Sequence, residues 1–166
     1  MTALRVGQGF DVHRFSGDPG RHLVLGGIVV EGAAGLSGHS DADVLSHALA
    51  DAMLGAAGMG DLGGHFPDDD PEWAGASSIG LLAKVADMVA ENGLKAVNAD
   101  CTVVCERPRL AAHTESMGSS LAAVIGAPVS VKAKRAEGLG SLGRVEGIAC
   151  LAVVLLCSNS TEGEAK

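Results

Sequence analysis

Aromatic side chains are scarce in this chain of 166 residues, which has no tyrosine and only Phe10, Phe15, Phe66 and Trp73. Proteins that bind single-stranded nucleic acid without sequence preference stack the bases on aromatic side chains. The formal net charge of −8 also opposes binding to a phosphate backbone. The composition therefore argues against a nucleic-acid partner.

Long apolar runs and C-x-x-C motifs are also missing. No stretch has the length and apolarity of a membrane span, so no membrane partner is expected. The cysteines at 101, 105, 150 and 157 lie in apolar strand-like runs, which predicts buried, reduced thiols in a cytoplasmic protein. The polar strand-like segment that starts by Arg5 leaves no room for a secretory signal. A plastid stromal protein that has lost its transit peptide would look the same.

The apolar pattern predicts alternating strands and helices within one domain, residues 1–158, followed by a polar tail, 159–166. Strands are predicted at 4–12, 22–31, 98–106, 128–134 and 147–157, and helices after Ser40, at 77–91 and at 109–125. Ser40 is the expected N-cap of the first helix, with Asp43 completing a capping box. The order lacks the regular βαβ rhythm, which favours an α+β fold with helices on one face of a mixed sheet.

The segment GFDVHRF, residues 9–15, places Asp11 and His13 on one face of a strand, because side chains at i and i+2 leave in the same direction. In the first helix, Asp43, His47 and Asp51 repeat every four residues and form a polar stripe. If this helix packs on the strand, Asp11, His13 and His47 make a catalytic zinc set with one open position. The alternative is an ordinary hydrogen-bonded pair beside a solvated helix face.

A second cluster of chemistry-bearing residues is VKAKRAEGLGSLGRVEG, residues 131–147. It contains four of the twelve basic residues and several glycines that let the backbone approach a ligand. These features suit a phosphate-bearing ligand, with Glu137 as a magnesium ligand beside a diphosphate. A solvated basic edge strand with a flexible loop explains the pattern equally well.

Two further segments are candidate ligand sites. GDLGGHFPDDDPEW, residues 60–73, is a loop whose three aspartates suit a cation or hydroxyl groups, or simply a solvated turn. In CERPRLAAH, residues 105–113, a strand runs into a helix started by Pro108, and the N-terminus of such a helix attracts anions.

Taken together, the motifs GFDVHRF, LGG, GHSDADVLSHALADAMLGAAGMGDLG, FPDDDP, the P-R-L turn and EGLGSLGRVEGIA resemble the 2-C-methyl-D-erythritol 2,4-cyclodiphosphate synthase family over about residues 4–157. The resemblance implies a homotrimer with a four-stranded sheet, helices on one sheet face, and active sites between subunits. It also implies conversion of 4-diphosphocytidyl-2-C-methyl-D-erythritol 2-phosphate to the cyclic diphosphate with release of CMP. This phosphorus–oxygen lyase reaction belongs to the non-mevalonate isoprenoid pathway.

The resemblance also implies roles for particular residues. Zinc, or Mn²⁺ or Co²⁺ in its place, is expected on Asp11, His13 and His47, and Mg²⁺ or Mn²⁺ on Glu137. Catalytic roles are expected for His39 and Arg135. The implied substrate contacts are Asp11, Val12 and His13 at the metal; His39 and Ser40 at the 2-phosphate; Asp61, Leu62 and Gly63 at the diol; Phe66, Pro67, Asp68, Asp69 and Asp70 in the family's mobile loop; Cys105, Glu106, Arg107, Pro108, Arg109, Leu110 and Ala111 at the cytidine; and Lys134, Arg135, Ala136, Glu137, Ser141 and Arg144 near the phosphates.

The chain departs from the family pattern at two places. Lys134, Arg135 and Ala136 replace a threonine-rich run, and Arg135 stands where a threonine is assigned to transition-state stabilisation. A guanidinium group can supply charge there instead, because it binds phosphate through two hydrogen bonds. Ser141 replaces an aromatic residue found in some members.

Two other functions remain open from the residues themselves. A zinc phosphoesterase would attack a phosphate with zinc-bound hydroxide, and its general base would be Asp43 or His39. A non-catalytic trimer that binds isoprenoid diphosphates would hold zinc as a structural ion, and Cys101 or Cys105 would be the candidate fourth ligand.

Overall fold

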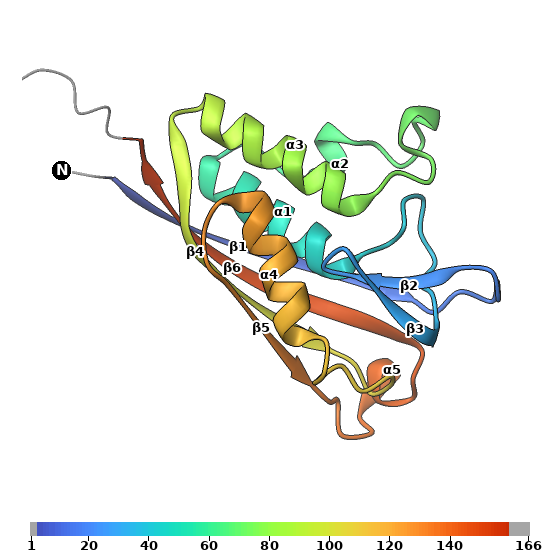
Figure 1. Ribbon diagram of the computed structural model, residues 1–166. Helices are drawn as coiled ribbons and strands as arrows, with labels where there is room; N and C mark the ends of the chain where they lie inside the picture. Colours follow the sequence, from blue (N-terminus) through green and yellow to red (C-terminus); the bar gives the residue numbers. More distant parts are fainter. Residues whose placement is uncertain (1–2, 160–166) are drawn as a thin grey trace, which may run out of the picture.

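Four strands form one mixed sheet in the computed structural model, which describes residues 3–159 (Figure 1). The strands are β1 (Leu4–Arg14), β4 (Leu94–Val104), β5 (Val129–Lys134) and β6 (Gly147–Ser158), in the order β1-β6-β4-β5. β6 is antiparallel to both neighbours, whereas β4 and β5 are parallel. The α+β fold class predicted from the sequence is confirmed. Residues 160–166 of the predicted polar tail lie outside the described part of the chain.

β6 occupies the centre of the sheet, as its sequence predicts. A central strand with apolar side chains on both faces reads as a continuous hydrophobic run, and residues 147–157 do so. The side chains that point to the helices are buried: Ile148, Cys150, Ala152, Val154 and Leu156. All four cysteines are free and buried, so the prediction of buried thiols is confirmed.

Three helices cover one face of the sheet (Figure 1). They are α1 (Val44–Ala57), α3 (Ser78–Glu91) and α4 (Thr114–Ile125). The apolar side chains of α1 are inaccessible to solvent, with Val44, Leu45 and Leu49 fully buried. Shorter helices, α2 (Leu62–His65), η1 (Pro71–Trp73) and α5 (Gly140–Gly143), lie in the connections. Within residues 3–159, no helix has both the length and the apolar character needed to cross a bilayer.

The predicted single strand over 22–31 is wrong, because this segment is a hairpin. β2 (His22–Leu25) and β3 (Ile28–Ala34) pair antiparallel around Gly26 and Gly27, whose φ angles are +60° and +73°. Consecutive positive φ angles are the requirement of a two-residue hairpin turn, and glycine meets it without strain. Both turn N–H groups donate to the carboxylate of Asp43, at 2.8 and 2.7 Å.

Two predicted helix starts are also wrong. The N-cap of α1 is Asp43, whose carboxylate accepts from the backbone N–H groups of Leu45 and Ser46; Ser40 instead accepts from Ala42, ahead of the helix. α4 begins at Thr114, not at 109, because residues 105–113 form a turn that contains a cis Arg107–Pro108 peptide. The helix N-terminus expected at Pro108 as an anion site is therefore not there.

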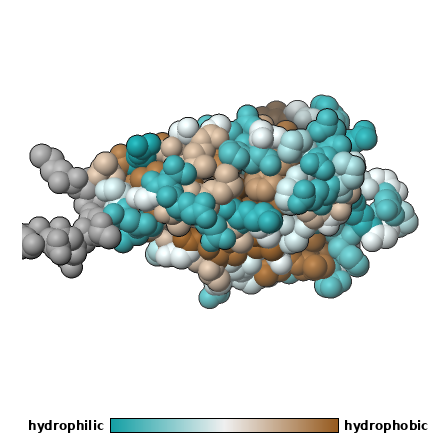
Figure 2. Space-filling view, turned by 90° about the horizontal axis from the view of Figure 1, so that it is seen from above, coloured by the Kyte–Doolittle hydropathy of each residue, from teal (hydrophilic) through white to brown (hydrophobic). Residues whose placement is uncertain are grey.

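The other face of the sheet carries no helix from residues 3–159 and exposes apolar side chains. Phe10 and Val12 of β1 are 52% and 49% exposed, and Leu151 and Val153 of β6 are 43% and 45% exposed. The strand register places Phe10 opposite Leu151. By contrast, hydrophilic residues are numerous on the side seen in Figure 2, which looks from above onto the side where Figure 1 shows α3. In this view hydrophobic residues gather along one edge.

Candidate active site

The helix α1 lies directly against β1, and two glycines make this approach possible. A Cβ atom on Gly7 would lie 1.9 Å from the carbonyl oxygen of Ala52, and one on Gly9 would lie 2.0 Å from that of Ala48. Real Cβ atoms do not approach so closely, so any larger residue would displace the helix. The close packing brings His47, the neighbour of Ala48, to the strand face that carries Asp11 and His13.

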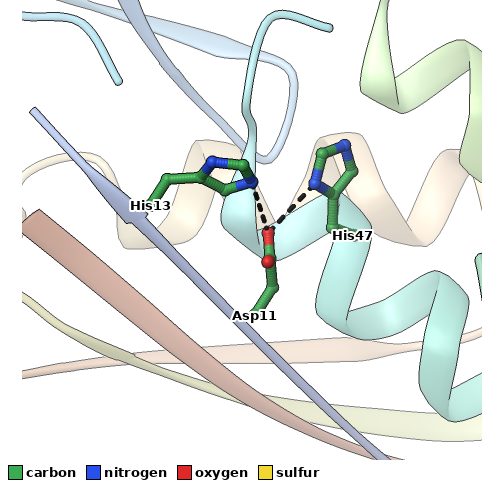
Figure 3. A group of neighbouring side chains, drawn as sticks. All are labelled: Asp11, His13 and His47. Carbon is green, nitrogen blue, oxygen red and sulfur yellow. Dashed lines mark hydrogen bonds and ion pairs between the residues drawn. The ribbon is translucent and has the colours of Figure 1, made fainter. Parts of the chain in front are cut away.

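Asp11, His13 and His47 converge as predicted (Figure 3). Oδ2 of Asp11 lies 3.2 Å from Nε2 of His13 and 3.0 Å from Nδ1 of His47. The three ligand atoms are all within 4.8 Å of one another. Phe10 and Val12 point to the opposite, exposed face of the sheet, so the side chain of Val12 does not join the cluster.

The hydrogen bonds around the cluster suit a metal ion. Nδ1 of His13 lies 2.7 Å from the carbonyl oxygen of Ser37, which only accepts, so Nδ1 carries a proton. In the charged ring Nε2–H also donates to Asp11, whereas in the neutral ring the Nε2 lone pair is free for a metal ion. Gly38 leaves room for this ring, because a Cβ atom there would lie 3.0 Å from its Cε1 atom. Two ring nitrogens and one carboxylate oxygen are a typical catalytic zinc set.

The charges of the cluster reinforce one another. Burial alone would raise the pKa of Asp11, but hydrogen bonds and charge interactions with His13 and His47 hold it far below its ordinary value. The hydrogen bond to Asp11 raises the pKa of His13 despite its burial. A carboxylate that stays ionised is the form in which aspartate binds a metal.

The cluster opens into a cavity of about 460 Å³. The predicted residues His39, Ser40, Leu62, Gly63, Phe66 and Asp68 line it. Asp51 of the predicted polar stripe also lines it, as do three residues for which no site role was expected: Gly38, Trp73 and Leu81. Asp61 and Asp70 are the N-cap residues of α2 and η1, and their carboxylates accept from the backbone N–H groups of Gly64 and Glu72 respectively. The lining does not include four of the predicted residues: Asp61, Pro67, Asp69 and Asp70. The T-shaped pair of Phe66 and Trp73, with ring centroids 5.1 Å apart, forms part of the wall.

Two contacts connect the loops around this cavity. Nε2 of His39 lies 3.1 Å from the carbonyl oxygen of Asp70, and Arg21 donates to the carbonyl oxygen of Ser40. Ala42, in the same loop, has a φ of 58°, a left-handed conformation that costs energy in residues other than glycine. The segment that carries His39 and Ser40 is therefore held in a defined shape on both sides.

Asp51 is the most informative residue that was missed. It belongs to the predicted polar stripe, one helical turn beyond His47, and its carboxylate accepts from the backbone N–H of Leu62 at 2.7 Å. Burial raises its pKa, and the nearby charges of Asp61 and Asp11 act in the same direction. The four-residue repeat was the available signal, but its meaning depended on where the helix packs.

The other predicted residues gather at a second, separate cavity of about 270 Å³. Because β4 and β5 are parallel, their carboxyl ends meet at one sheet edge, where Cys105 N–H donates to the carbonyl oxygen of Lys134 at 2.9 Å. The lining contains eight predicted residues, with Ala133 completing it: Cys105, Glu106, Pro108, Arg109, Leu110, Ala111, Lys134 and Arg135. Burial raises the pKa of Cys105 to about 11, so this cysteine stays a neutral thiol. Arg107 lines a neighbouring groove instead.

The basic residues of this region are mostly paired with acids. Lys132 contacts Asp100, Arg135 contacts Glu106 through Nε and Nη2, and Arg144 lies 2.6 Å from Glu146. The hydrogen bonds from Arg135 lower the pKa of Glu106 and raise that of Arg135 itself. Glu137 has a left-handed φ of 53°. Ala136, Glu137, Ser141 and Arg144 line neither of the two cavities.

Comparisons with known proteins agree with this architecture. The model of the YgbB family matches residues 4–157. The chain is 52% identical to the 2-C-methyl-D-erythritol 2,4-cyclodiphosphate synthase of Symbiobacterium thermophilum, over 92% of this chain and 98% of the relative. It is 50% identical to the synthase of Alcanivorax borkumensis, over 94% and 98% of the two chains.

Solved structures give the same result. The bifunctional IspDF of Campylobacter jejuni superposes with a TM-score of 0.90 at 40% identity, covering 95% of this chain and 43% of that longer one. IspF of Plasmodium falciparum in complex with CDP has a TM-score of 0.82 at 28% identity, covering 95% and 98%. The family resemblance noted in the sequence is thus confirmed over nearly the whole chain, which belongs to the YgbB family.

Proposed function

We propose that the protein converts 4-diphosphocytidyl-2-C-methyl-D-erythritol 2-phosphate to 2-C-methyl-D-erythritol 2,4-cyclodiphosphate and CMP, as one synthase domain over residues 1–158. The observation that carries the proposal is the convergence of Asp11, His13 and His47 beside a cavity. Relatives that are half identical over nearly the full length carry the name of this synthase. Free buried thiols are typical of a reducing compartment, which supports a cytoplasmic location.

The reaction needs positioning and charge neutralisation more than a protein nucleophile. An oxygen of the substrate's 2-phosphate forms a bond to the β-phosphorus. The bond from that phosphorus to the oxygen it shares with the α-phosphorus breaks, and CMP leaves with the electron pair. Zinc held by Asp11, His13 and His47 would supply Lewis-acid polarisation of the β-phosphate. Magnesium near Glu137 would neutralise the remaining phosphate charge.

The chain's own residues then take distinct tasks. His39 and Ser40 bind the 2-phosphate next to the metal cluster, and Asp61 with Gly63 binds the diol. The segment Cys105–Ala111 receives the cytidine, and Lys134 and Arg135 contribute positive charge at the edge of that pocket. Backbone N–H and C=O groups of this segment, which contains Glu106 and Arg107, form hydrogen bonds with the cytosine base.

We assign these tasks to a homotrimer, because two separate cavities of one chain would have to serve one substrate. They are the metal cavity, which contains Asp11, His13 and His47, and the basic cavity, which Lys134 and Arg135 help to line. The apolar face of β1 and β6 supports this assembly, since exposed apolar patches mark interaction surfaces. Packing that face against two further copies would place the cytidine pocket of one chain next to the metal cavity of its neighbour.

A hydrolytic alternative is weaker. Asp43, one of the two candidate general bases, is fully buried and accepts hydrogen bonds from Gly26, Gly27, Leu45 and Ser46. It therefore has no access to a water molecule in the metal cavity. His39 is the remaining candidate, and its Nε2 faces the carbonyl oxygen of Asp70.

The test is ³¹P NMR of the purified protein with substrate and Mg²⁺, before and after zinc is removed by chelation and then restored. The expected result is CMP together with a cyclic diphosphate, lost on chelation and recovered with zinc. CMP together with an uncyclised product would mean that water is the nucleophile. An unchanged phosphorus spectrum with zinc present would contradict the proposal.

A further inference from the structure

The outer edge of His47 meets two side chains from separate parts of the chain. Its Nε2 atom lies 2.8 Å from Oγ of Ser78, the first residue of α3. That hydroxyl in turn lies within hydrogen-bond distance of Oδ1 of Asp41, in the loop before α1. Ser78 is completely buried. Neither Ser78 nor Asp41 lines the metal cavity.

The direction of each hydrogen bond follows from the chemistry of the groups. An ionised carboxylate only accepts, so the hydroxyl proton of Ser78 points to Asp41. The oxygen of Ser78 is then left to accept, so its hydrogen bond with His47 requires Nε2–H as the donor. Ser40 also lies 3.1 Å from this oxygen and 3.2 Å from Nε2 of His47, so it can share the same polar contact without reversing it.

The consequence appears on the other side of the ring. When Nε2 carries the proton of a neutral imidazole, Nδ1 presents its lone pair, and this atom lies 3.0 Å from Asp11. His13 reaches the same state through its bond to Ser37. Two lone pairs and a carboxylate oxygen then face one another, an arrangement that a cation stabilises and that is strained without one.

We propose that Ser78 and Asp41 are positioning residues for the metal ligand His47: they fix its tautomer and the orientation of its ring. This inference rests on the proposed function only in taking the cluster as a metal site. Partners behind a ligating histidine set ligand basicity, and their loss commonly costs 10- to 100-fold in metal affinity.

Asp41 also has a structural role that an experiment must separate from this one. Both of its carboxylate oxygens accept from the backbone N–H of Ser78, at 3.2 Å. It thereby stabilises the start of α3, where an anion is favourable. Ser77 provides a matched control, because it is the N-cap of the same helix but makes no side-chain capping hydrogen bond.

The first measurement is Zn²⁺ affinity of the metal-free full chain, by competition with a chromophoric chelator. We expect Ser78→Ala to weaken Zn²⁺ binding about 10- to 100-fold and Ser77→Ala to leave it within about twofold. Thermal unfolding of the metal-free forms shows whether both variants fold. Zinc affinity of Ser78→Ala equal to that of the wild type would overturn the proposal.

Asp41→Asn supplies a second test that does not depend on the fold of Ser78→Ala. The amide oxygen can still accept from Ser78, so we expect an affinity between those of the wild type and Ser78→Ala, and a shifted visible spectrum of the Co²⁺-loaded protein. An unchanged spectrum together with wild-type affinity would count against the proposal. Metal binding is scored without substrate, so a wild-type protein that binds zinc but forms no cyclic product would refute the proposed function alone.

Discussion

The two cavities of this chain are built in different ways. At the metal cavity, a carboxylate and two imidazoles point at one another from two packed elements, and hydrogen bonds fix the outer nitrogen of each ring. At the basic cavity, Arg135 is paired with Glu106 within the same chain, and its side chain is 57% exposed. The fold thus preassembles the cluster Asp11, His13 and His47, whereas Arg135, which we propose to bind phosphate, is already paired with an acid of its own chain.

The largest effect on activity is expected at the metal cavity. His13→Ala removes one of three ligands, and we expect turnover to fall about 1,000-fold or more, since the metal supplies several kcal/mol to the transition state. Turnover and zinc content are measured together. His22→Ala, which alters an exposed histidine at the start of β2, is the control and should retain both. A fully active His13→Ala protein would show that the cluster is not catalytic.

The second prediction concerns the exposed apolar face of β1 and β6, which would form the subunit interface of the proposed trimer. Phe10→Asp removes about 2 kcal/mol of apolar burial per chain and adds an unpaired charge, so we expect trimers to dissociate. Light scattering after size-exclusion chromatography gives the mass. Val29→Asp serves as control, because Val29 is also an exposed apolar residue, at 43%, but lies on β3. If Phe10→Asp remains a trimer, the interface lies elsewhere.

A third prediction tests how close packing assembles the metal site. Gly9→Ala places a Cβ atom against the carbonyl oxygen of Ala48, and we expect the free energy of unfolding to fall by about 1–3 kcal/mol. Zinc affinity should fall as well, because His47 moves with the helix. Urea unfolding and chelator competition measure the two effects. Gly17→Ala, where a Cβ atom meets nothing within 4 Å, should change neither.

The smallest effect is expected at the basic cavity. The hydrogen bonds from Arg135 lower the pKa of Glu106 below its ordinary 4.5, so the pair stabilises the fold above that value and loses its effect as the pH falls through the lowered pKa. Glu106→Gln should therefore lower the melting temperature slightly at neutral pH and not in acid. Melting curves across this range provide the comparison. A difference that persists in acid would have another origin.

Much of the site could be predicted because it depends on local periodicity. The period of a strand puts Asp11 and His13 on one face, and the period of a helix puts His47 and Asp51 on another. These patterns could not show that His47 meets Asp11 and His13, since this contact depends on the packing of α1 on Gly7 and Gly9. The family resemblance supplied that step. Ser78 escaped notice because it lies 31 residues from His47 in the chain and carries no motif.

The wrong boundaries have a common cause. Ser40 and Asp43 are both good N-cap residues, and the choice between them is made by Gly26 and Gly27, which bind the Asp43 carboxylate from a distant hairpin. Pro108 begins many helices but here belongs to a turn. In each case a tertiary contact or a turn decided between two local signals of similar strength.

The separation of the two cavities within one chain has a genetic consequence. A variant defective only in the metal cluster keeps an intact cytidine pocket, and a variant defective only in that pocket keeps an intact metal cluster. If the chains assemble as the homotrimer that we propose, refolding two such inactive chains together would give mixed assemblies with interfaces at which both intact halves meet. Each defect would then complement the other, although neither variant would be active alone.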